Sequence, residues 1–348
     1  MALLRELDPG EVGWAERVKP AERQAPRAIL FHPDGAREEL PLHGCAGHLA
    51  AKGGFLYADL QAPNEKELDA LQREFHFHPL AIEDVRTRHQ RPKIDIYGDQ
   101  YFLVFYRIGP SERGEDWVLQ ELDFFIGPNF LIVTHDSEVE LLNKIFARFG
   151  REEGKKDVSG LLYDILGTLV DDYFLFLDDL GERSQQIEDE IFEHYDQVHL
   201  ERLLALKKDL ALLRRVAAPE RDAVNVLLRR DPPILDAARI FYFQDIYDHL
   251  IRIADSIDTY RELATGTLDA FLSVQNNKLS EIVRKLTVIS TAFLPLMFVT
   301  SFFGMNFAKL AGAGDRLFVL GMVVMSAFEV AIFFFLWWWG ILGRRRVE

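Results

Sequence analysis

The chain has 348 residues and a formal net charge of −15, which favour more than one structural unit and disfavour nucleic acid as a partner. Phosphate binding needs a basic patch, whereas an acidic surface is either simply solvated or supplies carboxylate ligands for Mg²⁺ or Ca²⁺. Cys45 is the single cysteine, so an intrachain disulfide and a CxxC metal site are both excluded. Residues 1–24 are charged and do not have the apolar segment of a signal peptide, and we expect a large part of the chain in the reducing cytoplasm.

Residues 26–135 alternate between strand-like and helix-like segments. Segments rich in β-branched and aromatic residues predict strands at 27–32, 54–60, 93–98, 100–108, 117–127 and 129–136. Between them we expect helices at 64–75, capped by Asn64, and at 78–86. This alternation predicts an N-terminal cytoplasmic α/β domain with a mixed sheet over residues 1–160.

A different pattern follows the α/β segment. Residues 161–233 predict a cytoplasmic helical hairpin, with Pro219 expected to break the second helix and the DPP of 231–233 to start a new one. Residues 234–303 contain only Gly266 and Pro295 as helix-disfavouring residues. One continuous stalk helix of about 70 residues would be about 105 Å long.

Two apolar runs near the C-terminus predict transmembrane helices. Residues 286–303 carry no charge and 317–343 carry only Glu329, and a span needs about 20 apolar residues. The sequence FFFLWWW suits an aromatic interface belt better than the alternative, a buried helical hairpin. Basic residues flank the pair at 284–285 and 344–346, so the positive-inside rule places both termini in the cytoplasm of a multi-pass protein of the cytoplasmic membrane. The 304–316 loop is then extracytoplasmic and 344–348 is a basic cytoplasmic tail.

The loop begins with the tripeptide Gly304-Met305-Asn306. Mg²⁺ is small and dehydrates reluctantly, and a ring of Asn306 carbonyls from several subunits would accept hydrogen bonds from its waters. Gly304 would let the backbone turn, and Met305 would pack behind this selectivity ring. The alternative is an ordinary helix terminus capped by Asn.

A polar and apolar stripe recurs every three or four residues along the first predicted span, as expected for a pore wall. It contains Ser280, Val283, Thr287, Thr291, Leu294 and Met297. Helix packing is the alternative for each of them. Two spans per chain cannot enclose a pore, so the interpretation requires an oligomer.

The tripeptide after the first of two C-terminal spans, the helix before it, and the stretch HPLAIEDVRTRHQRPKIDIY resemble the CorA family of divalent metal (magnesium and cobalt) transporters. The resemblance covers roughly residues 50 to 348. It implies a CorA-like funnel assembled as a homopentamer, with no enzymatic activity. It also implies constrictions near Val283, Leu286 and Leu294, and an acidic ring at Asp269.

The same resemblance implies regulatory metal sites between subunits. Glu83, Asp84 and Asp245 match carboxylates that hold regulatory Mg²⁺ and close the channel, with Asp171 and Asp172 as further candidates. Mg²⁺ is thus expected as both substrate and regulatory ligand, without an organic cofactor. A solvated helix face is the alternative.

Glu329 and the pair His76 and His78 are further candidate functional residues. Glu329 inside a span is costly, and we expect a protonated, hydrogen-bonded structural role rather than transport. His76 and His78 have no matching third ligand nearby, and the sequence shows neither a Walker motif nor a catalytic arrangement.

Three readings of the function stay open. The outer loop sets Lys309 and Arg316 against Asp315 and so does not concentrate cations. We expect a channel for Mg²⁺, with Co²⁺ and Ni²⁺ as further permeants. The alternatives are a proton-coupled Zn²⁺ transporter of the related ZntB branch and a membrane-anchored metal sensor.

Overall fold

A computed structural model describes residues 26–88, 90–110, 117–151, 157–193, 197–229, 234–304 and 315–338. The chain divides into two compact units, Met1–Leu268 and Asp269–Glu348, and each is described by itself. The domain boundaries expected from the sequence stay predictions.

A mixed sheet of seven strands forms the centre of the first unit within the described residues. The strands are β1 (Arg27–Phe31), β2 (Arg37–Leu40), β3 (Phe55–Gln61), β4 (Lys93–Tyr97), β5 (Gln100–Pro110), β6 (Trp117–Ile126) and β7 (Phe130–His135). Their order is β2-β1-β3-β7-β6-β5-β4, with β3 and β7 parallel and every other neighbouring pair antiparallel. The predicted strands are therefore confirmed, whereas β2 was not predicted.

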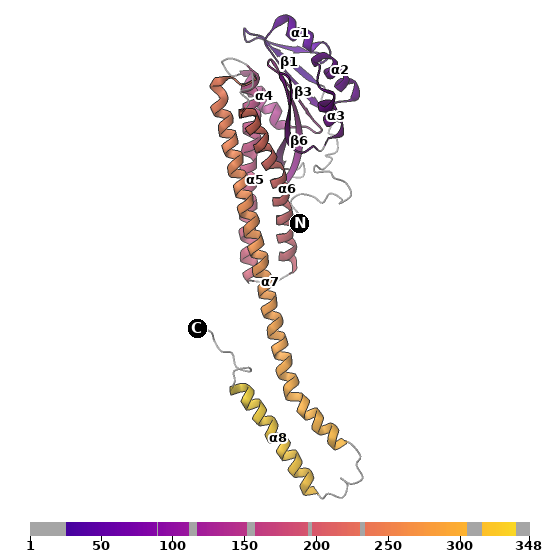
Figure 1. Cartoon of the computed structure of the whole chain (residues 1–348), viewed down its shortest axis with the longest axis vertical. Helices are drawn as coiled ribbons and strands as arrows, with labels where there is room; N and C mark the ends of the chain where they lie inside the picture. Colours follow the sequence, from indigo (N-terminus) through magenta and orange to yellow (C-terminus); the bar gives the residue numbers. More distant parts are fainter. Residues whose placement is uncertain are drawn as a thin grey trace. The chain divides into compact units, whose positions relative to one another are not determined.

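Three short helices cover one face of the sheet: α1 (Cys45–Lys52), α2 (Glu65–Phe75) and α3 (Pro79–Thr87) (Figure 1). Asn64 caps α2 in a reciprocal capping box with Glu67, which confirms the predicted cap. Aromatic side chains join this layer to the sheet, since the Phe77 ring stacks on Phe125 with centroids 4.2 Å apart.

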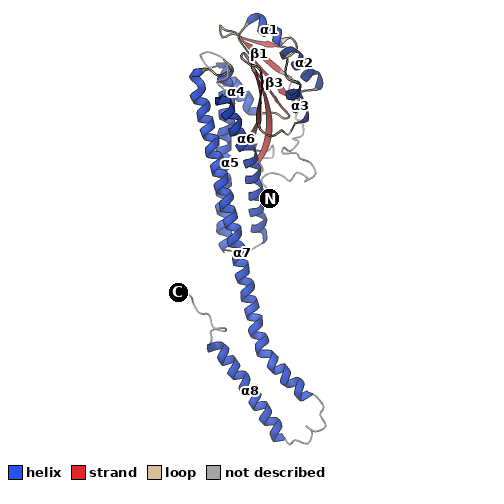
Figure 2. Ribbon diagram, in the orientation of Figure 1, coloured by secondary structure: helices blue, strands red, loops and turns tan. Residues whose placement is uncertain are grey.

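The other face carries α4 (Glu140–Arg151), α5 (Val158–Glu193) and α6 (Gln197–Arg229). Figure 2 shows these helices in blue beside the red sheet. The N-terminal part of α7 (Ile240–Gly304) packs on this layer. Gly181 of α5 permits the close approach, because a Cβ there would lie 2.6 Å from the Tyr260 hydroxyl. Arg214 of α6 also donates to Asp258 of α7 at 3.0 Å.

Two predicted helix boundaries were wrong. Helix α6 continues through Pro219, although this residue has no N–H to donate to the carbonyl of Arg215. The helix persists because its neighbours Val216, Ala217 and Glu220 are buried against the rest of the unit. Helix α7 begins at Ile240, after a 3₁₀ turn, rather than at 234. Residues 231–233 lie outside the described part of the chain.

Glu220 explains why α6 lies against the sheet at this point. Strand β5 extends beyond β4, whose pairing ends at Val104, so the later N–H groups of β5 need other acceptors. The Glu220 carboxyl is fully buried and accepts from the Tyr106 N–H at 2.8 Å and the Tyr173 hydroxyl at 3.1 Å. Burial raises the pKa of Glu220 well above its ordinary value, despite these two hydrogen bonds.

We predict that Glu220→Gln stabilises the first unit increasingly as the pH rises. The unfolded carboxyl ionises near its ordinary pKa, while the folded one stays protonated, so the wild type loses stability above that pKa and the Gln variant does not. Melting temperatures of the purified chain at pH 5 and pH 8 measure this gap. Glu220→Leu is expected to lose about 1–3 kcal/mol, because the buried Tyr106 N–H loses its acceptor.

The exposed Glu201→Gln on the same helix is the matched control and should melt close to wild type at both pH values. An equal difference between wild type and Glu220→Gln at the two pH values would contradict the prediction.

The second unit contains the C-terminal part of α7 and helix α8 (Asp315–Trp338). Large apolar side chains on both helices are exposed in the single chain, including Leu286 at 62%, Leu294 at 68% and Trp338 at 75%. A search restricted to the described residues finds no helix long and apolar enough to cross a membrane. The two spans expected from the sequence stay predictions.

Candidate functional site

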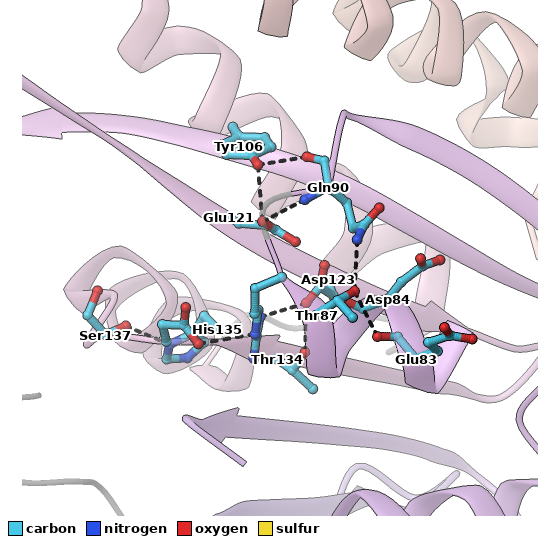
Figure 3. Close-up of polar contacts among 12 residues, drawn as sticks. Glu83, Asp84, Thr87, Gln90, Tyr106, Glu121, Asp123, Thr134, His135 and Ser137 are labelled. Carbon is cyan, nitrogen blue, oxygen red and sulfur yellow. Dashed lines mark hydrogen bonds and ion pairs between the residues drawn. The ribbon is translucent and has the colours of Figure 1, made fainter. Parts of the chain in front are cut away.

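Helix α3 carries the first pair of candidate metal ligands, Glu83 and Asp84. Its start is fixed by His78, whose ring nitrogen accepts from the Leu80 N–H, and by Pro79 at the first helical position. Glu83 is exposed and Asp84 is half-buried. Figure 3 shows both carboxylates pointing away from the polar cluster that lies at the end of the helix.

A buried ion pair fixes the end of α3. The Arg88 guanidinium donates to Asp123 of β6 at 2.6 Å, and Asp123 is completely buried. Arg88 has a positive φ of 52° with an extended ψ, which ends the helix while its N–H still bonds the Asp84 carbonyl. The position of Asp84 is therefore tied to the sheet through Arg88.

A second buried carboxyl extends this cluster along β6. Glu121 accepts from the Tyr106 hydroxyl at 3.0 Å and from the Gln90 N–H at 3.2 Å (Figure 3). Burial raises the pKa of Asp123, although the Arg88 charge and the hydrogen bond from Thr134 oppose the shift. The cluster thus holds α3 against β6.

We predict that Arg88→Met destabilises the chain by about 3 kcal/mol, because it leaves Asp123 buried without its cation. Asp123 would then have its pKa raised further, so the variant should regain stability as the pH falls toward the ordinary pKa of aspartate. Denaturant titration at pH 5 and pH 8 tests this expectation.

Arg86→Met is the control two residues away. Arg86 pairs with Glu65 and Asp69 at the surface, where such pairs contribute up to about 1 kcal/mol. Equal losses in the two variants would mean that burial of the Arg88 pair adds nothing.

The other candidate ligands lie on the opposite helical layer. Asp171 and Asp245 are exposed on α5 and α7, and Asp245 lies 3.6 Å from His249. Burial raises the pKa of Tyr163, and the charges of Asp245, Asp164 and Asp171 raise it further, so the structure brings Asp171 and Asp245 into one neighbourhood. Burial raises the pKa of the half-buried Asp172, and the nearby Arg107 opposes this rise.

A single chain does not assemble these ligands into one site. Glu83 and Asp84 belong to the layer of α1–α3, whereas Asp171, Asp172 and Asp245 belong to helices on the other side of the sheet (Figure 1). Among the described residues, no group of three or more His, Cys, Asp or Glu side chains is arranged to hold a metal ion. The carboxylates offer the oxygen ligands that Mg²⁺ prefers, but each set is incomplete without further ligands.

The candidate pore residues follow one another along α7. All are exposed in the single chain: Asp269, Ser280, Val283, Leu286, Thr287, Thr291, Leu294 and Met297. The Thr287 and Thr291 hydroxyls each donate to the carbonyl four residues earlier at 2.8 Å, which leaves their oxygens as acceptors. Their assignment to a pore stays a prediction.

The tripeptide lies at the limit of the described structure. Gly304 is the last residue of α7, and Met305 and Asn306 fall outside the described residues. Glu329 lies within α8, and its side chain is likewise outside the described part.

A polar pocket beside the parallel strand pair was missed by the sequence analysis. It is lined by Arg27, Asp59, Gln61, His135, Glu138, Val139 and Asn143. The buried His135 ring lies 2.8 Å from Asp59 and 2.6 Å from the Ser137 carbonyl. Asp59 and His135 lie toward the carboxyl ends of β3 and β7, where polar groups commonly gather in α/β folds. The polar ends of two otherwise apolar strands were the available signal.

Comparisons with known proteins agree on one family. The profile described as "CorA-like Mg2+ transporter protein" matches residues 52–345. The cobalt/magnesium transport protein CorA of Thermotoga maritima is 32% identical over 245 residues, which cover 69% of this chain and 70% of that protein.

Two solved structures have a similar fold. The CorA magnesium transporter from Methanocaldococcus jannaschii superimposes with a TM-score of 0.72 at 23% identity, covering 89% of this chain and 96% of that one. The ZntB cytoplasmic domain from Vibrio parahaemolyticus gives a TM-score of 0.60 at 16% identity, covering 72% and 98%.

Proposed function

The chain belongs to the CorA-like Mg²⁺ transporter family, whose members are transporters rather than enzymes, and we propose that it moves Mg²⁺ across the cytoplasmic membrane. The carrying observation is that the family match includes α7 to its end at Gly304, directly before Met305 and Asn306. Co²⁺ and, with it, Ni²⁺ are proposed as further permeants, since the relative from Thermotoga maritima is named a cobalt/magnesium transport protein.

The proposal places α8 and the C-terminal part of α7, residues 286–303, in the bilayer. Support comes from the uncharged run 286–303 and from the exposed apolar side chains of the second unit. Such side chains need lipid or another protein surface to cover them. We further propose that several copies, five by family resemblance, bring their α7 helices around a common pore with both termini in the cytoplasm.

Asn306 is proposed as the selectivity ring. We predict that Asn306→Ala lowers Mg²⁺ flux into liposomes at least about tenfold, because the side-chain carbonyls would no longer accept hydrogen bonds from the hydrated ion. Flux of Mg²⁺ into vesicles loaded with a fluorescent indicator measures the effect.

Asn225→Ala is the matched control, since Asn225 lies on α6 and bonds Arg229. Wild-type flux through Asn306→Ala, with Asn225→Ala also normal, would reject the selectivity ring.

Mg²⁺ is also proposed as a regulatory ligand that closes the channel. Asp84 with Glu83 on one subunit, and Asp245 with Asp171 and Asp172 on its neighbour, would supply the carboxylates. Neither set alone is a metal site within the described residues of one chain, as expected if the ligands are divided between subunits. Metal bound between subunits would favour the closed state, and its loss would let the carboxylates repel one another.

We predict that Asp84→Asn and Asp245→Asn each raise the Mg²⁺ concentration that protects the chain from proteolysis, because each removes a charged ligand. Trypsin digestion across a Mg²⁺ series gives the midpoint. Asp222→Asn, which removes an exposed carboxylate paired with Arg221, should leave it unchanged. Unchanged midpoints in both ligand variants would refute the regulatory sites.

A proton-coupled Zn²⁺ transporter is the second candidate, favoured by the similarity to the ZntB cytoplasmic domain. The outer loop, with Lys309 and Arg316 against Asp315, does not concentrate cations and is compatible with it. Met305 favours the Mg²⁺ reading, since the zinc branch commonly varies the middle residue of the tripeptide.

A further inference from the structure

Lys93 already occupies the carboxylate that the regulatory metal is proposed to use. This first residue of β4 places its ammonium 2.7 Å from Asp84 of α3 and 2.8 Å from Asp95 of its own strand. The strand is fixed by pairing of Lys93 with Val104 of β5. An intramolecular cation is therefore held between two acidic oxygens, one from Asp84 and one from Asp95.

The ammonium keeps its charge in this position. Lysine is a cation at neutral pH, and the two carboxylates that it contacts, Asp84 and Asp95, both stabilise the charged form. The pair is also partly shielded, since Asp84 is only 19% exposed. A positive charge thus lies directly against Asp84.

A divalent cation cannot share the same oxygen with this ammonium without strong repulsion. Two positive charges a few ångströms apart repel even in water, and a dication doubles the effect. Lysine is a compact point charge on a flexible stem, so the ammonium can swing away when a metal arrives. Metal binding at Asp84 is then an exchange of cations rather than occupation of a vacant carboxylate.

We propose that Lys93 is a tethered competitor for the regulatory metal, and that it sets the Mg²⁺ concentration at which the closed state forms. This inference rests on the proposed function, in which Asp84 is a ligand of that metal. In the metal-free chain, Lys93 neutralises Asp84 and holds α3 against β4. As the Mg²⁺ concentration rises, the dication displaces the ammonium from Asp84. Lys93 therefore keeps the regulatory metal site empty at low Mg²⁺ concentration.

The test measures the Mg²⁺ midpoint for protection from trypsin in the purified full-length chain. Lys93→Met removes the charge and keeps most of the stem, and should lower the midpoint about tenfold, the size expected for one positive charge near a dication in a partly solvated setting. Lys93→Arg keeps the charge and should stay within about threefold of wild type. Lys52→Met is the matched control. Lys52, at the end of α1, forms a similar pair with Glu38 at 2.7 Å, and its loss should not change the Mg²⁺ midpoint.

Variants made in the Asp84→Asn background distinguish failure of the Lys93 competitor from failure of the metal site at Asp84. If Asp84→Asn raises the midpoint, Lys93→Met should have little further effect in that background, because the competed carboxylate is gone. A raised midpoint in Asp84→Asn with an unchanged or raised midpoint in Lys93→Met overturns the competitor and leaves the metal site standing. An unchanged midpoint in Asp84→Asn overturns the metal site, and the competitor with it. Lys93→Arg, which keeps the ion pair, shows whether a shift in Lys93→Met follows the charge or a loss of folding.

Discussion

The buried ion pair of Arg88 with Asp123 is the interaction on which the proposed regulatory metal site at Glu83 and Asp84 depends. Asp123 lies in the centre of the sheet with no exposed surface, and a charge in such a place must be paired. Its cation comes from the residue that ends α3, so satisfying the sheet also fixes the helix that carries Glu83 and Asp84. Any movement of α3 relative to β6 would have to break or stretch this pair.

A buried polar contact also links the sheet to the helices on its other face. Beyond Val104 the edge of β5 that faces away from β6 has no neighbouring strand, and Glu220 of α6 supplies an acceptor to the Tyr106 N–H there at the cost of burying a carboxyl. The α/β layer is thereby linked by buried polar contacts to the helices that pack on α7. These contacts have few alternatives in an apolar interior, which makes them suited to transmit small displacements as discrete changes.

Much of the fold followed from sequence pattern, and the misses have physical reasons. Segments rich in β-branched and aromatic residues marked β3, β5, β6 and β7, and the cap at Asn64 marked α2. The strand β2 is short and charged, and α1 begins at Gly44 without a side-chain cap. Pro219 indicated a break that burial of its neighbours overrides.

The candidate site, like the fold, could be predicted from the sequence only in part. Candidate ligands such as Asp84 and Asp245 came from family resemblance, because nothing in their local spacing distinguishes a ligand from a solvated carboxylate. The contacts that position them were not predictable, since Arg88 and Asp123 are 35 residues apart and Lys93 meets Asp84 across a helix and a strand. The available signal was Glu121 and Asp123 inside the otherwise apolar strand β6, where isolated charges require partners.

The proposed function is passive Mg²⁺ conduction under the control of cytoplasmic metal. Reconstituted protein in liposomes, assayed for Mg²⁺ and Zn²⁺ entry with and without an imposed pH gradient, tests it most directly. The account predicts Mg²⁺ entry without a pH gradient, reduced when Mg²⁺ is present on the cytoplasmic side. Absence of Mg²⁺ entry, with Zn²⁺ entry only under a proton gradient, would contradict it and favour the zinc transporter.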